Sequence, residues 1–180
     1  MNFKKSKYKT GEKALTQNQV KKLLDVIGDV EDEALIRLAV TTGLRRSDIV
    51  RVRVADVDVD AGTLSFYEAK KDIIRQVYLQ PSTCTCLRKH MKTKAKGALL
   101  FNFSSRTAWN RLNKWLDRAG LPRRPFHALR STTIKLCQQA GWPIEMTAAL
   151  VNDKIATVQE HYLCPSQEEM KETTDCKPTI

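Results

Sequence analysis

The sequence lacks several features that would place it in other classes of protein. No apolar run approaches the roughly 18 residues that a membrane-spanning helix needs, and residues 1–11 are polar and lysine-rich, unlike a secretory signal peptide. The five cysteines are odd in number and irregularly spaced, and Cys84 and Cys86 have no second pair or histidine at zinc-ligand spacing. We therefore expect reduced thiols in a cytoplasmic protein, with no metal and no cofactor.

Acidic residues are too few to balance the basic ones. The 20 aspartates and glutamates face 31 lysines and arginines, which gives a formal net charge of +11. Such an excess favours a polyanionic partner, and nucleic acid is the usual one; charge alone leaves open a merely soluble basic protein. With 180 residues, 42% of them apolar, the chain is long enough for one domain with a core.

The two ends of the chain differ in charge from the middle. Residues 1–13 hold five lysines against one glutamate, and we expect a basic arm that either lies along phosphates or acts as a solubilising tail. Residues 166–180 are polar and acidic, and we expect a mobile tail. We expect residues 14–165 to form the folded domain.

The pattern of residues 14–165 predicts a mainly α domain with a small antiparallel three-stranded sheet, an α+β fold. Thr16 and Gln19 form a capping box that opens the first helix. Apolar residues alternate with polar ones from Val52 to Val59, and a turn follows, as expected for strands. The expected helices cover 16–27, 31–42, a short segment capped by Ser47, 81–91, 105–119, 126–140, 143–151 and 157–162, and the expected strands cover 52–59, 63–67 and 76–79.

The segment Leu38–Val52 holds the first group with possible chemistry. A helix, a turn at Gly43 and a second helix are also the layout of a helix-turn-helix DNA reader, and this segment alone does not decide between the two interpretations. In the other interpretation, Arg45 directs its planar guanidinium at two oxygens of a phosphate, and Asp48 holds it in place.

Three further side chains suit phosphate chemistry. A lysine at a hairpin tip is usually a solvated charge, but beside a phosphate Lys70 would donate a proton to a departing 5′ oxygen. His127 and Arg130 lie three residues apart at the predicted start of a helix, so they share a face where backbone N–H groups favour an anion. A lone histidine is more often structural.

Tyr162 lies at the end of the last predicted helix. A tyrosine in such a place is normally a packing residue, as expected for the other tyrosines of the chain. Tyr162 differs because of the groups that precede it. Attack of a phenol oxygen on a DNA phosphodiester needs a nucleophile, cations and a titratable base, and the chain offers Arg45, Lys70, His127 and Arg130 in that order.

These segments resemble the boxes of the tyrosine recombinase family, which includes phage integrases and the recombinases that resolve chromosome dimers. Thr42–Asp48 resembles the T-G-x-R-x-S-E/D box, and His127–Arg130 matches the H-x-L-R box. Arg75–Leu79 resembles the second strand of the hairpin whose turn carries the family's lysine. Leu150–Tyr162 resembles the L-G-H-x-x-I-x-T-T…Y box, and the resemblance as a whole runs from about Lys13 to Pro165.

The resemblance implies the fold of the family's catalytic domain and an enzyme that cleaves and rejoins DNA. Cleavage would pass through a 3′-phosphotyrosyl link to Tyr162, without nucleotide or metal. The implied partners are double-stranded DNA and further copies of the chain, as a tetramer in synapsis, and the implied setting is a virus or mobile element. The implied catalytic residues are Arg45, Lys70, His127, Arg130, Asn152 and Tyr162, with Lys71 as the fallback for Lys70.

The sequence departs from the family in two places. Asn152 stands where a histidine or tryptophan is usual, and it can donate a neutral hydrogen bond but carries no charge. We therefore expect cleavage slower by about one to two decades. The family's N-terminal DNA-clamping domain has no counterpart before residue 13, which predicts either a domain fragment or a short recombinase.

Three alternatives stay open at this stage. The first is a DNA-binding protein of the same fold that no longer cleaves, as the departure at Asn152 suggests. The others are a relaxing enzyme like a type IB topoisomerase and a helix-turn-helix regulator built on Leu38–Val52. The basic residues expected to contact only the DNA backbone are Arg106, Arg111, Lys114, Arg118, Arg123 and Arg124.

Overall fold

The computed structural model describes residues 11–162, and of Glu12, His161 and Tyr162 it describes the backbone alone. The predicted tail at 166–180 and most of the predicted arm lie outside the described residues. The helices are α1 (Gln17–Asp25), α2 (Val30–Thr42), α3 (Arg46–Ile49), α4 (Pro81–Met91), α5 (Ser105–Arg118), α6 (His127–Gln139), α7 (Ile144–Val151) and α8 (Ile155–Tyr162), with short 3-10 turns η1 (Gly11–Lys13) and η2 (Val54–Asp56).

One small antiparallel sheet accompanies these helices, in the order β1 (Val57–Asp58), β2 (Thr63–Glu68), β3 (Ile73–Tyr78). The predicted mainly α fold with a three-stranded sheet is confirmed. The first strand is shorter than the predicted 52–59, because the Asp56 carboxylate accepts a hydrogen bond from the backbone N–H of Arg53 and turns the chain into η2. Along β2, Leu64, Phe66 and Glu68 point to the buried face, as the period of two requires.

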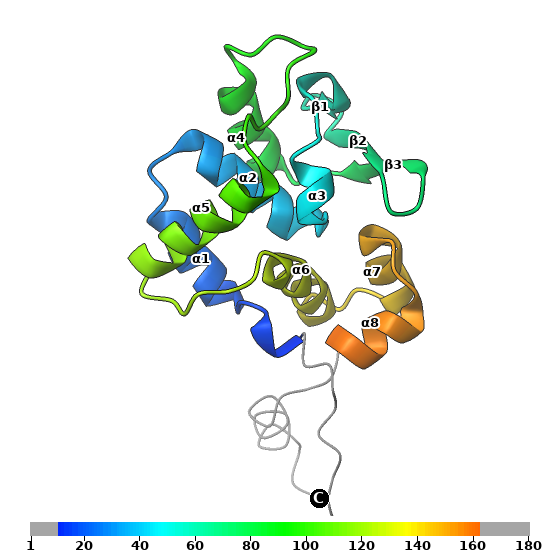
Figure 1. Ribbon diagram of the computed structural model, residues 1–180. Coiled ribbons are helices and arrows are strands. Elements are labelled where there is room, and N and C mark those ends of the chain that lie inside the picture. Colours follow the sequence, from blue (N-terminus) through cyan, green and yellow to red (C-terminus); the bar gives the residue numbers. More distant parts are fainter. Residues whose placement is uncertain (1–10, 163–180) are drawn as a thin grey trace, which may run out of the picture.

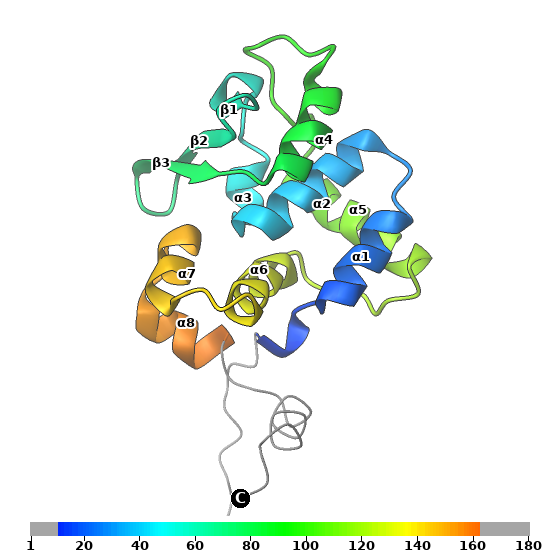
Figure 2. The same ribbon diagram turned by 180° about the vertical axis from the view of Figure 1, so that it is seen from behind.

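Helix α2 lies at the centre of the core. The sheet, α3 and α4 lie to one side of it, and α6, α7 and α8 lie to the other (Figures 1 and 2). Leu35, Ile36 and Leu38 of α2 are fully buried, and α2 contacts α4, α5 and α6. Because the two groups of elements meet across α2, residues far apart in the sequence come together where its C-terminal end lies.

The helix ends explain how the chain turns at that place. The capping box of Thr16 and Gln19 is present, and Gly43 ends α2 in the left-handed conformation with φ 65°. The predicted cap of the next helix was wrong: Arg45 is the N-cap of α3, and Ser47 lies inside it. Helix α8 begins at Ile155, two residues before the predicted start.

The N-terminal segment is fixed to α6 rather than to the sheet. The backbone N–H of Leu15 donates to Oγ1 of Thr132 at 2.8 Å, inside the core. No helix within residues 11–162 is long and apolar enough to cross a bilayer. In the same part of the chain, no three His, Cys, Asp or Glu side chains are grouped as ligands for a metal ion.

Candidate active site

Arg45 is positioned by the sharp end of α2. The left-handed Gly43 reverses the chain, so that Arg45 follows in an extended conformation directly before α3. Its Nη1 donates to Oε1 of Glu68, which is its only hydrogen-bond partner among the described residues. Asp48, the partner expected from the sequence, is buried nearby, and burial raises the pKa of its carboxyl despite the positive charge of Arg45. Glu68, rather than Asp48, therefore holds the guanidinium of Arg45.

Glu68 is a buried carboxylate, with 1% of its side chain exposed. Its Oε2 accepts from Nδ2 of Asn152 at 2.6 Å and from Nη1 of Arg75 at 3.3 Å. Burial alone would raise the pKa of Glu68, but the hydrogen bonds from Asn152 and Arg45, together with the charges of Arg45 and Arg75, outweigh burial and lower it. Glu68 is therefore ionised at neutral pH.

The side chain of Arg130 links the C-terminal ends of α2 and α7 by hydrogen bonds. Its Nη1 donates to the carbonyl oxygen of Gly43 at 2.9 Å, and its Nη2 donates to the carbonyl oxygen of Val151 at 2.5 Å and to Oδ2 of Asp153 at 3.1 Å. Its side chain is 3% exposed. Its Nε is buried and has no hydrogen-bond partner among the described residues. A buried donor of this kind is costly unless another group accepts from it.

His127 is the first residue of α6, and its side chain is exposed. The protein around the ring displaces water and lowers the pKa of His127, and the positive charges of Arg130 and Arg45 lower it further, against the opposing effect of Asp153. The imidazole is therefore neutral at neutral pH, the form that accepts a proton.

Asn152 is the C-cap of α7, with φ 51°. Asparagine is among the few residues that adopt this left-handed conformation at little cost. Both ends of its side chain are used: Nδ2 donates to Glu68, and Oδ1 accepts from Nζ of Lys71 at 2.9 Å. Nζ of Lys71 also donates to the backbone carbonyl of Asn152 at 2.7 Å.

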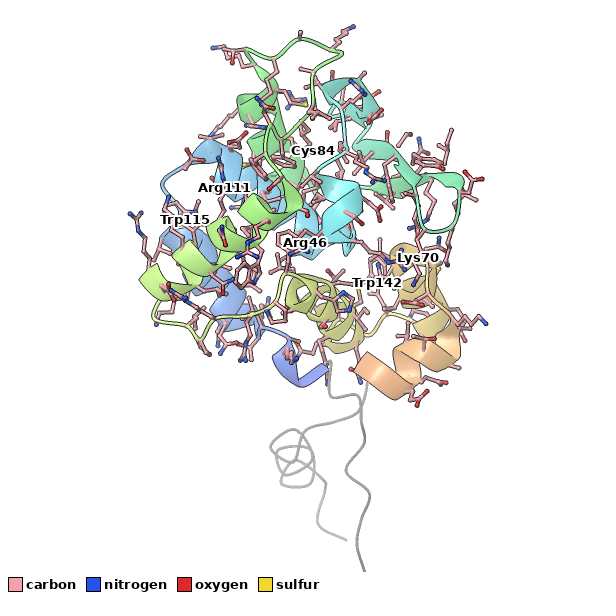
Figure 3. The ribbon with its side chains drawn as sticks, in the orientation of Figure 1. Arg46, Lys70, Cys84, Arg111, Trp115 and Trp142 are labelled. Atoms are coloured by element: carbon pink, nitrogen blue, oxygen red, sulfur yellow. The ribbon has the colours of Figure 1, made fainter. Side chains whose placement is uncertain are left out.

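The β2–β3 loop, which carries Lys70, reaches toward α7 (Figure 3). The two lysines of this loop differ in their contacts. Lys71 binds Asn152, whereas Lys70 is exposed and makes no hydrogen bond or ion pair with another described residue. Nη2 of Arg75, on β3, donates to the carbonyl oxygens of Ala149 and Leu150 at 2.7 and 3.1 Å. Cations at the C-terminal end of a helix also complement its dipole.

The structure thus brings four of the six predicted residues to one place. Arg45, His127, Arg130 and Asn152 come from the start of α3, from α6 and from the end of α7, and they meet around two carboxylates, Glu68 and Asp153. For the other two predicted residues, Lys70 and Tyr162, the structure gives a position near this group but no contact with it. Lys70 is on the adjacent loop, and Tyr162 is the last residue of α8, which contacts α6 and α7.

Glu68, Arg75 and Asp153 were absent from the predicted site. Glu68 had a usable signal, because it follows Leu64 and Phe66 at a period of two and so belongs to the buried face of its strand. A charge on that face needs partners. Arg75 and Asp153 had no such signal in the sequence.

Most of the basic residues expected to contact the DNA backbone lie on α5, and several have partners within the chain. Arg111 binds Glu31 and Asp32 at 2.8 and 2.7 Å, and Arg123 binds Asp117 at 2.9 Å. Arg106 lies over the ring of Trp109, while Lys114 and Arg118 lie over the ring of Trp115. A cation over an aromatic ring is attracted by the ring and keeps its charge, and Lys114 also lies 4.0 Å from Oδ2 of Asp32.

An open groove of about 1010 Å³ lies near the site and is distinct from it. Its lining is largely apolar and comes from α1, α2, β3, α4, α6 and α7. Arg75 and Leu150 line it, whereas Arg45, His127 and Arg130 do not. The charged groups therefore face a separate part of the surface.

Comparison with known proteins gives a consistent result. Residues 13–169 match the model of the phage integrase family. Tyrosine recombinase XerA of Saccharolobus solfataricus is 30% identical over 148 residues, which are 82% of this chain and 50% of that protein. The chain spans about half the length of the relatives it matches.

Solved structures share the fold. The crystal structure of XerA recombinase has a TM-score of 0.80 at 20% identity, with 93% of this chain and 64% of that chain covered. XerH site-specific recombinase bound to its difH substrate, in a pre-cleavage complex, has a TM-score of 0.73 at 18% identity, with 98% and 56% covered. At these identities the likeness establishes the fold, and the fold implied by the sequence boxes is confirmed.

Proposed function

The chain belongs to the phage integrase family, and from this premise we propose that it cleaves and rejoins DNA through a 3′-phosphotyrosyl intermediate on Tyr162. One observation carries the proposal: Arg45, before α3, and His127 and Arg130, on α6, surround one place, and there Arg130 keeps a buried Nε without a partner among the described residues. A phosphate oxygen is a suitable acceptor for that N–H.

In the proposed reaction, Arg45 and Arg130 hold the scissile phosphate and stabilise the extra negative charge of the pentavalent transition state. Oη of Tyr162 attacks phosphorus and gives its proton to the neutral ring of His127. The bond from phosphorus to the 5′ oxygen breaks, and that oxygen takes a proton from Lys70. The phosphotyrosyl bond is itself a phosphodiester, so no bond energy is lost to water. A 5′ hydroxyl can therefore attack its phosphorus and rejoin the strand by the reverse steps.

Asn152 belongs to the proposed site as the residue in the place of the family's histidine or tryptophan. It offers the phosphate no charge, and its amide already donates to Glu68. We therefore keep the expectation that cleavage is slower than with histidine there, by about one to two decades. The same observation favours one second candidate, a DNA-binding protein of this fold that cleaves poorly or not at all.

The helix-turn-helix alternative receives no support from the geometry. Helix α3 has only four residues, from Arg46 to Ile49, and a recognition helix must be long enough to lie in the major groove. Arg45, at its start, is directed toward Glu68.

We propose double-stranded DNA as the partner, with several copies of the chain assembled on it as a tetramer. The net charge of +11 and the likeness to a recombinase solved on its DNA site support the first part. In this proposal residues 14–165 are the catalytic domain, residues 1–13 lie along the DNA, and residues 166–180 dock onto a neighbouring copy. The protein would act in the cytoplasm or nucleoid of the host.

The test is a covalent trap. A preferred duplex is first selected from random DNA by binding, and a nicked form is then used so that the cleaved fragment diffuses away and the adduct accumulates. We expect a shifted band on a denaturing gel that is lost in Tyr162→Phe and kept in Tyr78→Phe, the same change at a tyrosine that is exposed and lies outside the site. Asn152→His is expected to strengthen the band.

The other outcomes are informative as well. A band from Asn152→His alone would indicate a fold retained for binding. No band from any variant, with binding to the duplex demonstrated, would overturn the enzymatic proposal. Relaxation of plasmid without recombinant products would indicate a relaxing enzyme instead.

A further inference from the structure

We propose that Glu68 is a positioning residue of the cleavage site, which fixes Arg45 and the turn before the Tyr162 helix in a single arrangement. This inference rests on the proposed function, because it assigns a role within that reaction. Glu68 would not touch the phosphate. It would act through Arg45 and Asn152, the two groups that its carboxylate binds.

The first support is that the three residues that donate to Glu68 come from different parts of the fold. Arg45 lies between α2 and α3, Arg75 lies on β3, and Asn152 is the C-cap of α7. Each donates a hydrogen bond to the one carboxylate. Since the partners come from three elements, a single buried group determines where these elements lie relative to one another.

The second support is charge. Two arginines, Arg45 and Arg75, approach the same buried place, and like charges at such a distance repel one another. The carboxylate of Glu68 cancels part of that repulsion. It binds Arg45 through Nη1 alone, and the described residues offer no hydrogen-bond partner to the remaining N–H groups of that guanidinium. Those groups stay available to a phosphate, in a direction that Glu68 sets.

The third support is the short path from Glu68 to the nucleophile. Asn152 binds Glu68, and α8 begins three residues later at Ile155. The same turn is held from two other points of the hairpin, by Lys71 at Asn152 and by Arg75 at the last carbonyls of α7. We call this set of contacts the hairpin latch: Glu68, Lys71 and Arg75 on the hairpin, bound to residues 149–152.

The hairpin latch also explains the departure from the family at position 152. The residue there must adopt φ 51°, donate to Glu68 and accept from Lys71. An asparagine meets all three conditions, because its amide has a donor end and an acceptor end. A neutral donor is suited to holding the turn, while the charges for the phosphate come from Arg45 and Arg130.

Three variants test the inference. Glu68→Gln removes the charge and leaves one acceptor oxygen in place of two, so that the amide cannot accept from both Arg45 and Asn152. Asn152→Gly keeps the backbone conformation and removes the side chain from the latch, while the bond between Arg45 and Glu68 stays. The double variant Glu68→Gln/Asn152→Asp exchanges donor and acceptor, since the amide introduced at position 68 then donates to a carboxylate that Lys71 can still bind. Glu33→Gln is the matched control, because it removes the same charge from an ion pair with Arg37 on α2.

The first readout is the single-turnover rate of adduct formation on saturating DNA, with the dissociation constant measured separately. We expect Glu68→Gln and Asn152→Gly to bind DNA with unchanged affinity and to cleave about 10- to 100-fold more slowly, the effect of displacing a reacting group by about an ångström. The double variant is expected to recover at least about fivefold over Glu68→Gln, and Glu33→Gln to match the wild type. Normal cleavage by Glu68→Gln, or no recovery in the double variant, would overturn the inference.

The second readout does not depend on cleavage. Hydrogen exchange of the backbone amides of residues 152–158 reports whether the latch holds the turn in the free protein. We expect exchange at least about fivefold faster in Glu68→Gln and in Asn152→Gly, and restored in the double variant. If the wild type forms no adduct, the proposed function fails, and exchange still decides: equal rates in the wild type and the single variants would show that no latch exists.

Discussion

Replacing Gly43 by alanine should destabilise the fold and disturb the site together. Gly43 has φ 65°, where an L-residue with a Cβ costs about 1–2 kcal/mol. A Cβ built at this position would lie 2.9 Å from Cγ1 of Val151, and overpacking of this kind typically costs about 1–3 kcal/mol. Alanine also restricts the unfolded chain, which returns about 0.4–1 kcal/mol.

The net loss in the free energy of unfolding is therefore about 3 kcal/mol for Gly43→Ala, the middle of these ranges. For a domain of this size it corresponds to a fall in Tm of roughly 5–10 °C. Urea and thermal unfolding followed by circular dichroism measure both quantities. Gly28→Ala is the matched control, because nothing lies within 4 Å of its Cβ position and its φ is not in the left-handed region. If the two variants were equally stable, the close approach of α2 to the end of α7 would be refuted.

Three further predictions concern charged groups. Arg111→Ala leaves the buried carboxylate of Asp32 with Lys114 alone, 4.0 Å away, as its cation and should lower the free energy of unfolding by about 2 kcal/mol in urea titrations. Arg123→Ala, which breaks an exposed pair, should leave the free energy of unfolding unchanged. Lys70→Ala should slow cleavage by about 10²–10⁴-fold, and a substrate with sulfur in place of the bridging 5′ oxygen should restore the rate, because a thiolate leaves without a proton; Lys71→Ala should not be rescued in this way. Because the pKa of His127 is held below its ordinary 6.5, the imidazole stays neutral down to that pH, so single-turnover cleavage should be independent of the charge state of His127 above pH 6.5 and fall as the pH drops below it. A fall in rate centred above pH 6.5 would contradict a role for this ring as the base, because the pKa of His127 is lowered.

The local parts of the fold could be predicted from the sequence because their causes are local. A capping box fixes the start of α1, and a glycine with positive φ fixes the end of α2. Alternation over β2 gave a strand with the correct buried face. The first strand was overestimated because valines at a period of two also suit a 3-10 turn that a side-chain bond to Arg53 stabilises.

The candidate site could be predicted only in part, for a physical reason. Arg45, His127 and Arg130 stand in recognisable boxes, and the structure brings them together. Their partners are chosen by tertiary contacts, which no pattern within one segment reveals. Whether Lys70 or Lys71 approaches α7 depends on the twist of a short hairpin, and the carboxylate that holds Arg45 lies on a strand 23 residues away.

The contacts that build the site determine at which stage of folding the site is formed. Lys71 and Asn152 are 81 residues apart in the chain, and Arg130 and Gly43 are 87 apart. Such contacts form late, because closing long loops has an entropic cost that only the finished packing offsets. The proposed nucleophile lies on α8, the last helix of the described residues, and it follows Arg45 and Arg130 in the chain. A growing chain therefore carries Arg45 and Arg130 before it carries Tyr162, and under the proposed function an unfinished molecule lacks its nucleophile.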